Sequence, residues 1–247
     1  RPRRRSSAIR SRREEAMGLA EQWGIKAIAF DIDGTLYPKR ALDIRLAISS
    51  AFHLPFAIRY NMMRQRIREA DGMGYHPPVS FEEFQRRECA LMYPGSDDRR
   101  LEWFREKEAR VFHSAWERLF LSIRPFPGMK EALTKASESY KLCALSDFPI
   151  GVKLRALGVE ELFSFKATSE DYGALKPSAT PFIAMLDAIS LPADAVLYVG
   201  DSERKDIAGA KGVGMRAALI SPSSRKVYSK ADLVFSSWDE FSAEVLD

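Results

Sequence analysis

The sequence predicts an α/β protein with a Rossmann-like, doubly wound parallel sheet as its core and an inserted all-helical domain. Three continuous apolar runs of strand length, at residues 25–30, 142–145 and 196–199, carry this prediction. Such runs are typical of strands whose two faces are both buried. Helical patterns separate these runs. The alternation favours a parallel sheet, because each crossover returns the chain to the same sheet edge.

Weaker patterns complete the predicted core. Shorter apolar stretches predict three further strands, at 163–168, 215–220 and 231–235. Apolar residues spaced three and four apart indicate amphipathic helices. These helices are expected at 128–140, 150–157, 178–189, 204–211 and 237–246.

The chain between the first two long apolar runs is far longer than one strand–helix unit of about 30 residues needs. Its surplus has helical spacing, with helices predicted at 42–54, 55–70, 81–93 and 101–121. We therefore predict a catalytic core from 21–39 and 125–247, a helical insert at 40–124, and an N-terminal extension at 1–20.

Composition excludes several classes of protein. The 247 residues are 46% hydrophobic and 29% charged, as in a soluble globular protein. No apolar run approaches the ~20 residues of a membrane-spanning helix. Two cysteines, Cys89 and Cys143, are too few for a disulfide scaffold or a thiolate zinc site, so we expect a cytoplasmic protein. The three histidines are scattered and are expected to do no chemistry.

The positive net charge comes from the N-terminal extension. Seven of the 38 Lys and Arg residues lie in 1–13, and the other 31 are outnumbered by the 34 acidic residues. The body of the protein is therefore not predicted to bind nucleic acid. Residues 1–13 could contact nucleic acid or an acidic partner, but a disordered extension is the favoured interpretation.

Polar residues follow each long apolar run. Asp31 and Asp33 follow the first, Ser146 and Asp147 the second, and Asp201 the third. In open α/β sheets, ligands bind beyond the carboxyl ends of the strands. Carboxylates that converge there suit a divalent cation, and Mg²⁺ prefers oxygen ligands and commonly shares a phosphate.

A phosphate group at this edge would need positive charge and hydrogen-bond donors besides the metal. Lys176 lies in the segment between two of these strands, and Ser146 and Thr35 carry hydroxyls. Helix N-termini add backbone donors. The predicted site therefore offers the cation and the hydrogen-bond donors that a phosphate group would need.

Four motifs in this order and spacing resemble those of the haloacid dehalogenase superfamily. They are DIDGT at 31–35, Ser146 after an apolar strand, Lys176-Pro177, and GDSERKD at 200–206. The resemblance covers residues 25–41 and 122–235. It implies a core of this superfamily, and it implies that the helical insert is similar to a type 1 cap.

The resemblance implies a role for each motif residue. Asp31 would be the nucleophile that forms an aspartyl-phosphate, and Asp33 would act as general acid and then as general base. Ser146 and Lys176, with Thr35 and Asp147 beside them, would bind the phosphoryl group. The metal ligands would be Asp31, the Asp33 backbone carbonyl and Asp201, and Asp206 would be either a further ligand or a support for the other ligands.

The acid at position 33 decides the subclass, because dehalogenases of this superfamily generally lack it and need no metal. We therefore predict a Mg²⁺-dependent phosphatase. The ester stays open: a sugar phosphate, a nucleotide monophosphate or phosphoglycolate. A phosphotransferase or mutase on the same core is an alternative. So is a non-catalytic binding protein that uses the arginine-rich segment.

Several residues have competing interpretations. Asp147 stands where many relatives carry Asn, and we favour a helix N-cap over a substrate selector. Cys143 is expected to be a small buried hydrophobe. Tyr37, Lys39 and Arg40 are candidates for substrate selection. An aromatic group in the insert is expected to be core rather than pocket lining: Trp103, Phe104, Phe112, Trp116 and Phe120.

Overall fold

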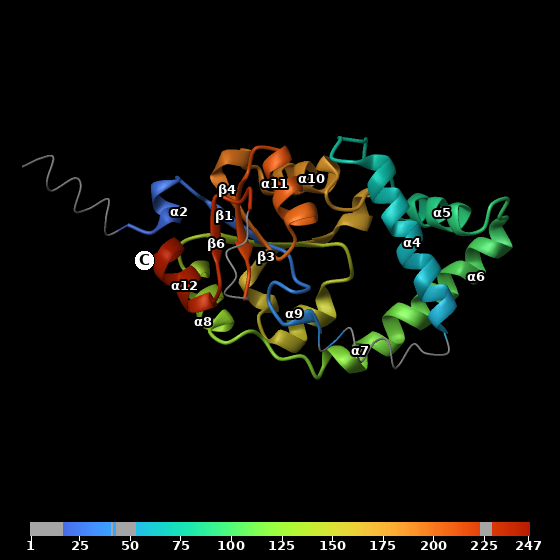
Figure 1. Cartoon of the computed structure of the whole chain (residues 1–247), viewed down its shortest axis with the longest axis horizontal. Coiled ribbons are helices and arrows are strands. Elements are labelled where there is room, and N and C mark those ends of the chain that lie inside the picture. Colours follow the sequence, from blue (N-terminus) through green and yellow to red (C-terminus); the bar gives the residue numbers. More distant parts are fainter. Residues whose placement is uncertain (1–16, 41, 43–52, 223–228) are drawn as a thin grey trace, which may run out of the picture.

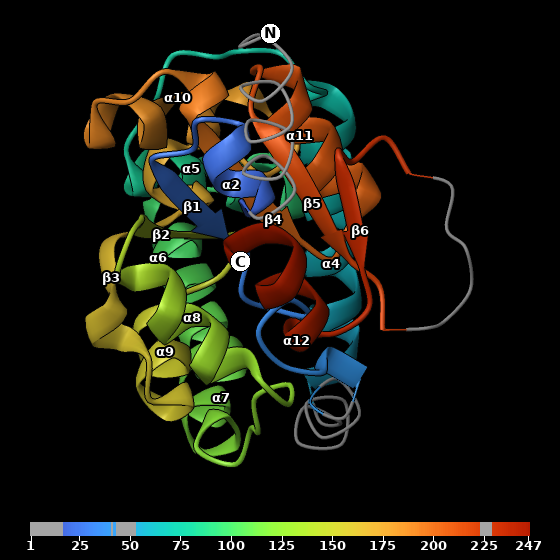
Figure 2. The ribbon, with the colours of Figure 1, turned by 90° about the vertical axis from the view of Figure 1, so that its left-hand side faces the viewer.

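A computed structural model describes residues 17–40, 42, 53–222 and 229–247. Its centre is a six-stranded, all-parallel sheet in the order β3-β2-β1-β4-β5-β6 (Figures 1 and 2). The strands are β1 (Ala27–Phe30), β2 (Lys141–Ser146), β3 (Phe163–Thr168), β4 (Val196–Gly200), β5 (Arg216–Ile220) and β6 (Leu233–Phe235). All six lie within a residue or two of the predicted strands.

The first strand sits in the middle of the sheet. β1 pairs with β2 on one side and with β4 on the other, so that Ala29 lies opposite both Cys143 and Tyr198. The chain winds outward from β1 in both directions, which confirms the doubly wound prediction. Because the strands are parallel, the residues after β1, β2 and β4 meet at one edge.

Helices cover both faces of the sheet, which explains why the strand sequences are apolar throughout. Ile28 and Phe30 of β1 belong to one hydrophobic cluster, whereas Ala27 and Ala29 belong to the other. The first cluster packs against α8 (Met129–Ser137), α9 (Gly151–Leu157) and α12 (Trp238–Phe241). The second packs against α10 (Ala179–Ile189) and α11 (Ala208–Gly212).

The insert between β1 and β2 is helical, and Figure 1 shows its longer helices beside the sheet rather than on its faces. It contains α4 (Leu54–Asp71), α5 (Phe81–Met92), α6 (Asp98–Glu108), the π-helical turn Ala109–Ser114 and α7 (Ala115–Phe120). Ser80 and Asp97 start α5 and α6 by accepting hydrogen bonds from backbone amides. The predicted helix at 101–121 is therefore interrupted by a π-turn. The one at 42–54 lies mostly outside the described residues.

The insert has its own hydrophobic core, as the aromatic residues predicted. Phe104 and Phe112 pack there with Phe56 and Tyr60. For Trp103 the prediction is wrong, because this residue is 40% exposed and packs only edge-on against Phe56 at the rim of the core. For Phe120 the prediction is wrong, because its ring packs in the sheet-side cluster instead. The side chain of Trp116 lies outside the described part of the chain.

The folded core begins earlier than predicted. Residues 19 and 20 fall within the predicted extension at 1–20, yet Leu19–Gln22 forms helix α2 and Ala20 is fully buried. A side-chain carbon at Gly18 would lie 2.4 Å from the Val245 carbonyl oxygen, so this segment packs tightly against the C-terminal turn. Residues 1–16, including the arginine-rich stretch, lie outside the described residues. Among the helices that are described, none is both long and apolar enough to span a membrane.

Candidate active site

Asp31 is placed by β1 itself. Its amide donates to the Val199 carbonyl at 2.9 Å and so extends the strand pairing by one residue. The carboxylate is 6% exposed and accepts the Thr35 hydroxyl at 3.2 Å. Gly34 has φ +94° and lets the chain turn back so that Thr35 reaches this oxygen.

Lys176 is the buried cation of the site. Its ammonium lies 2.6 Å from Asp31 Oδ1 and 2.6 Å from Asp206 Oδ1, and 3.1 Å from the Tyr198 hydroxyl oxygen. The residue is 1% exposed. Burial alone would lower the pKa of Lys176, but Asp206 and Asp31 raise it well above its usual value. Lys176 is therefore charged.

Three carboxylates at this edge of the sheet lie close enough to one another to hold a cation. One oxygen each of Asp31, Asp201 and Asp206 lie within 4.8 Å of one another. Burial and the neighbouring acids raise the pKa of Asp31 to about 7, against the opposing charge of Lys176. Partial loss of hydration and the charge of Asp206 raise the pKa of Asp201 to about 6. An all-oxygen donor set under mutual repulsion fits Mg²⁺, which would relieve that repulsion.

Two glycines allow this crowding. A side-chain carbon at Gly34 would stand 2.1 Å from Asp201 Oδ2. One at Gly200 would stand 2.3 Å from the Cβ of Asp206. Asp206 is further fixed by the Ser202 amide, which donates to its Oδ2 at 3.0 Å.

Asp33 has a different environment from Asp31. Lys153 of α9 donates to its Oδ2, Tyr37 donates to its Oδ1, and the Ser146 hydroxyl lies 3.3 Å from Oδ2. Burial would raise the pKa of Asp33, but the charge and hydrogen bond of Lys153 and the Tyr37 hydroxyl lower it below the usual value. Asp33 is therefore a carboxylate, whereas Asp31, with its raised pKa, holds a proton more readily.

Asp147 does not cap a helix, and this prediction is wrong. Helix α9 begins only at Gly151, and no side chain caps it. The Asp147 carboxylate instead accepts from Arg68 of α4 at 2.9 Å and from the Lys176 amide at 3.0 Å. Both oxygens are thus occupied by protein donors. The predicted direct contact of Asp147 with substrate phosphate stays untested.

The structure brings most of the other predicted site residues together. Asp31, Asp33, Ser146, Lys176, Thr35, Asp201 and Asp206 are brought together at the carboxyl edge of the sheet. Tyr37 was a candidate for substrate selection, but it is 1% exposed and contacts Asp33. His53 and His76 contact Lys107 and the Asp71 carbonyl, away from this group. The side chain of His113 lies outside the described part of the chain.

Sequence analysis missed two buried cations, Lys153 and Arg64. Lys153 lies between Ile150, Leu154 and Leu157 on the buried stripe of α9. Arg64 lies on the buried stripe of α4, one residue after Met63. A cation at an apolar position of a helical repeat signals a buried counter-charge. That signal was present in the sequence.

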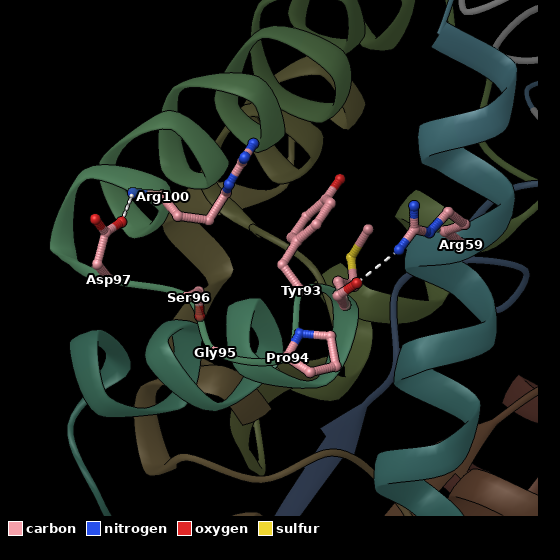
Figure 3. Close-up of a pocket in the computed structure, with 8 residues that line it drawn as sticks. Arg59, Tyr93, Pro94, Gly95, Ser96, Asp97 and Arg100 are labelled. Atoms are coloured by element: carbon pink, nitrogen blue, oxygen red, sulfur yellow. Dashed lines mark hydrogen bonds between the residues drawn. The ribbon is translucent and has the colours of Figure 1, made fainter.

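A separate pocket of about 480 Å³ lies in the insert, at the loop between α5 and α6 (Figure 3). Arg59 and Arg100 flank the Tyr93 ring at 5.0 and 5.4 Å. Its lining includes none of the carboxylates described above. We assign it no part in the chemistry.

A doubly wound parallel sheet with one buried lysine among three carboxylates defines an α/β enzyme with an acidic catalytic centre. Comparison with known proteins identifies the family. The model of the haloacid dehalogenase-like hydrolases matches residues 25–214, and the chain belongs to this family.

Curated relatives support the phosphatase type that the motifs predict. The chain is 27% identical over 210 residues to a glyceraldehyde 3-phosphate phosphatase of Methanopyrus kandleri, covering 79% of this chain and 84% of the relative. It is 28% identical over 207 residues to a phosphoglycolate phosphatase of Photorhabdus laumondii, covering 77% and 78%. The predicted family and its phosphatase type are thereby confirmed.

Solved structures agree on the fold. A 2-haloacid dehalogenase from Pseudomonas syringae has a TM-score of 0.61 and 24% identity, with 90% of this chain and 98% of that one covered. A phosphatase of the same superfamily from Thermococcus onnurineus has a TM-score of 0.58 and 22% identity, with 89% and 97% covered. These matches confirm a core of this superfamily with a helical cap. We therefore call the helical insert the cap; its limits at 40 and 124 stay a prediction.

Proposed function

We propose that the protein is a Mg²⁺-dependent phosphomonoesterase in which Asp31 is the nucleophile. The observation that carries this proposal is the position of Lys176, 2.6 Å from both Asp31 and Asp206. A buried lysine beside a carboxylate and two hydroxyl donors suits a phosphoryl group, whose equatorial oxygens need cationic and hydrogen-bonding partners.

In the first step, an Asp31 carboxylate oxygen attacks phosphorus, and the bond from phosphorus to the ester oxygen breaks. The departing alkoxide takes a proton from Asp33. Lys153 and Tyr37 hold Asp33 as a carboxylate in the free protein. The incoming phosphate dianion raises the proton affinity of Asp33, because like charge favours the neutral carboxyl, and Asp33 takes up one proton from solvent as the ester binds. The products are the alcohol and an aspartyl-phosphate.

In the second step, water attacks the phosphorus of the aspartyl-phosphate. Asp33, again a carboxylate, takes a proton from this water, and the bond from phosphorus to the Asp31 oxygen breaks. Inorganic phosphate leaves and the Asp31 carboxylate is restored. The Lys153 and Tyr37 contacts favour the base form of Asp33 that this step needs.

Asp31, Asp201 and Asp206, with the Asp33 carbonyl, would hold the metal. A bound Mg²⁺ would supply charge neutralisation for the phosphoryl oxygens. Ser146 and Lys176 would bind the same oxygens from the protein side. Lys176 also keeps Asp31 available as a nucleophile at neutral pH, because its charge opposes the effect of burial on the Asp31 pKa.

The substrate class is a small phosphorylated metabolite. The curated relatives include phosphatases of glyceraldehyde 3-phosphate, ribulose-1,5-bisphosphate and phosphoglycolate. These names span three- and five-carbon sugar phosphates and a two-carbon phosphate ester. We propose that the substrate of this enzyme belongs to the same range. A cytoplasmic location stays a prediction.

The test measures phosphate release from a panel of sugar phosphates, nucleotide monophosphates and phosphoglycolate. Each ester is assayed with Mg²⁺ and with EDTA, using the wild type, Asp31→Asn and, as a control, the exposed-site variant Asp194→Asn. We expect Mg²⁺-dependent release that Asp31→Asn abolishes and Asp194→Asn leaves intact. Release of an isomeric phosphate ester without free phosphate would favour a mutase. No product from any ester would refute the proposal.

A further inference from the structure

Two arginines of the cap helix α4 form hydrogen bonds with the loop that follows Ser146. Arg64 and Arg68 lie one helical turn apart and both reach Asp147. Arg64 donates to the Asp147 backbone carbonyl at 2.7 Å, and Arg68 donates to the Asp147 carboxylate at 2.9 Å. Arg64 is 1% and Asp147 is 4% exposed. The contact is therefore shielded from solvent, where charged hydrogen bonds are strongest.

The same carboxylate also holds the segment that carries Lys176. The second Asp147 oxygen accepts from the Lys176 amide at 3.0 Å. Arg68 Nε donates to the Lys176 carbonyl at 3.2 Å. Arg68, Asp147 and the Lys176 backbone thus form a closed ring of three contacts. The ring joins the cap helix to the two loops that present Ser146 and Lys176.

Only a carboxylate fits the centre of this ring. Each Asp147 oxygen accepts from a different donor, and an asparagine would offer one acceptor oxygen and one donor group. With asparagine, either Arg68 or the Lys176 amide would face an N–H group. Arg68 and Lys176 keep the pKa of Asp147 well below its usual range despite burial. The ring is therefore intact over the whole neutral range of pH.

We infer that Asp147 and Arg68 are positioning residues for phosphate binding, which set Ser146 and Lys176 at their working separation only while the cap helix is docked. This inference rests on the proposed phosphatase function. Asp147 and Arg68 contact neither the Lys176 ammonium nor the Ser146 hydroxyl within the ring. They therefore act on the substrate indirectly, by positioning these two groups. Arg64 lies outside this ring of contacts but holds the Asp147 backbone by its hydrogen bond. Its guanidinium also stacks on the aromatic side chain of Phe148, 4.5 Å from the centre.

The test compares Asp147→Asn, Arg68→Gln and the double variant. Arg66→Gln is the matched control, because Arg66 is an exposed arginine of the same helix. Two quantities are measured for each: the dissociation constant of inorganic phosphate by calorimetry, and kcat and KM with p-nitrophenyl phosphate and Mg²⁺. The melting temperature of every variant checks that it is folded.

We expect each single variant to weaken phosphate binding at least ten-fold and to lower kcat/KM by a similar factor. The double variant should be no worse than either single one, because both disrupt the same ring. Arg68→Lys, which keeps one donor, should recover part of the loss.

Unchanged phosphate binding in folded variants, or strictly additive losses in the double variant, would overturn the inference. A fall in melting temperature without a change in phosphate affinity would indicate a merely structural pair. Phosphate binding does not require turnover, so it separates this inference from the proposed function. If the wild type hydrolyses no ester but binds phosphate, and the ring variants weaken that binding, the proposed function fails and the positioning role stands.

Discussion

Lys153, a fully buried lysine of helix α9, donates a hydrogen bond to Asp33 Oδ2 and is the counter-charge of that carboxylate. Its ammonium also lies over the rings of Phe120 and Phe148, at 5.2 and 5.6 Å from their centres. Because the Lys153 ammonium is buried beside these aromatic rings, water cannot readily replace the Asp33 carboxylate as its partner. The charge state and orientation of Asp33 are therefore set by a residue outside the four motifs.

Lys153→Met is expected to lower kcat at least ten-fold. The pKa of Asp33 should rise when its counter-charge is lost, so that less carboxylate is available to accept a proton from water. The acidic limb of the kcat profile should move to higher pH, because kcat includes the second step, in which Asp33 is the base. Steady-state kinetics across pH measure both effects. Lys130→Met, at an exposed lysine of α8, is the control, and an unchanged kcat in folded Lys153→Met would contradict the assignment.

Asp201→Asn is expected to have opposite effects on stability and on metal binding. Asp201 has a pKa of about 6, raised by lost hydration and by Asp206, so its charge costs stability above pH 6. Without metal, the variant should melt at a higher temperature than the wild type at about pH 8. Its half-saturating concentration of Mg²⁺ should increase at least ten-fold. Asp194→Asn should change neither quantity, and an unaltered Mg²⁺ dependence of Asp201→Asn would exclude Asp201 as a ligand.

Stability should decrease as the pH rises through neutrality, because of two acids buried beside one arginine. Glu88 and Glu170 are at most 5% exposed, and both form ion pairs with Arg64. Both Glu88 oxygens lack a hydrogen-bond partner among the described residues. Burial raises the pKa of Glu88 well above its usual value, and burial with too little opposing charge raises the pKa of Glu170 to about 7.

The sign follows from proton binding. Between the usual carboxyl pKa and about 7, folded Glu170 holds a proton that the unfolded chain releases, so its contribution to stability falls across this interval and levels off above it. Glu88, whose pKa is raised well above its usual value, adds to the fall in the same direction. One proton corresponds to about 1.4 kcal/mol per pH unit, or roughly 3 °C in melting temperature for a chain of this size. Glu88→Gln should flatten the slope, whereas Glu83→Gln on the exposed side of α5 should not. Equal slopes in all three proteins would refute this account.

The sequence predicted the strands and the motif residues because both depend on local patterns. Apolar runs set the strands, and parallel strands bring Asp31, Ser146 and Asp201 to one edge whatever the rest of the chain does. Asp147 was misjudged because its partners, Arg68 and the Lys176 amide, are distant in sequence. In the sequence, an aspartate that caps a helix cannot be distinguished from one that forms a buried ion pair. The position of the cap helix distinguishes the two roles.

The buried cations were missed for a related reason. Lys153 and Arg64 occupy apolar positions of helical repeats, and a helical pattern tolerates one such residue without losing its periodicity. Only the tertiary structure shows that Asp33 faces Lys153 and that Glu170 faces Arg64. The acids paired with these two cations lie 120 and 106 residues away along the chain.

The central claim is that Asp31 becomes phosphorylated, and trapping that intermediate tests it most directly. The enzyme is mixed with a labelled substrate and Mg²⁺, quenched in acid within one turnover, digested and sequenced by mass spectrometry. We expect the phosphoryl group on the peptide that contains Asp31. With an aryl phosphate, whose leaving group needs no acid, it should accumulate further in Asp33→Asn, because that variant lacks the base for hydrolysis. A turning-over enzyme that carries no phosphoryl group, or one that still carries it in Asp31→Asn, would contradict the claim.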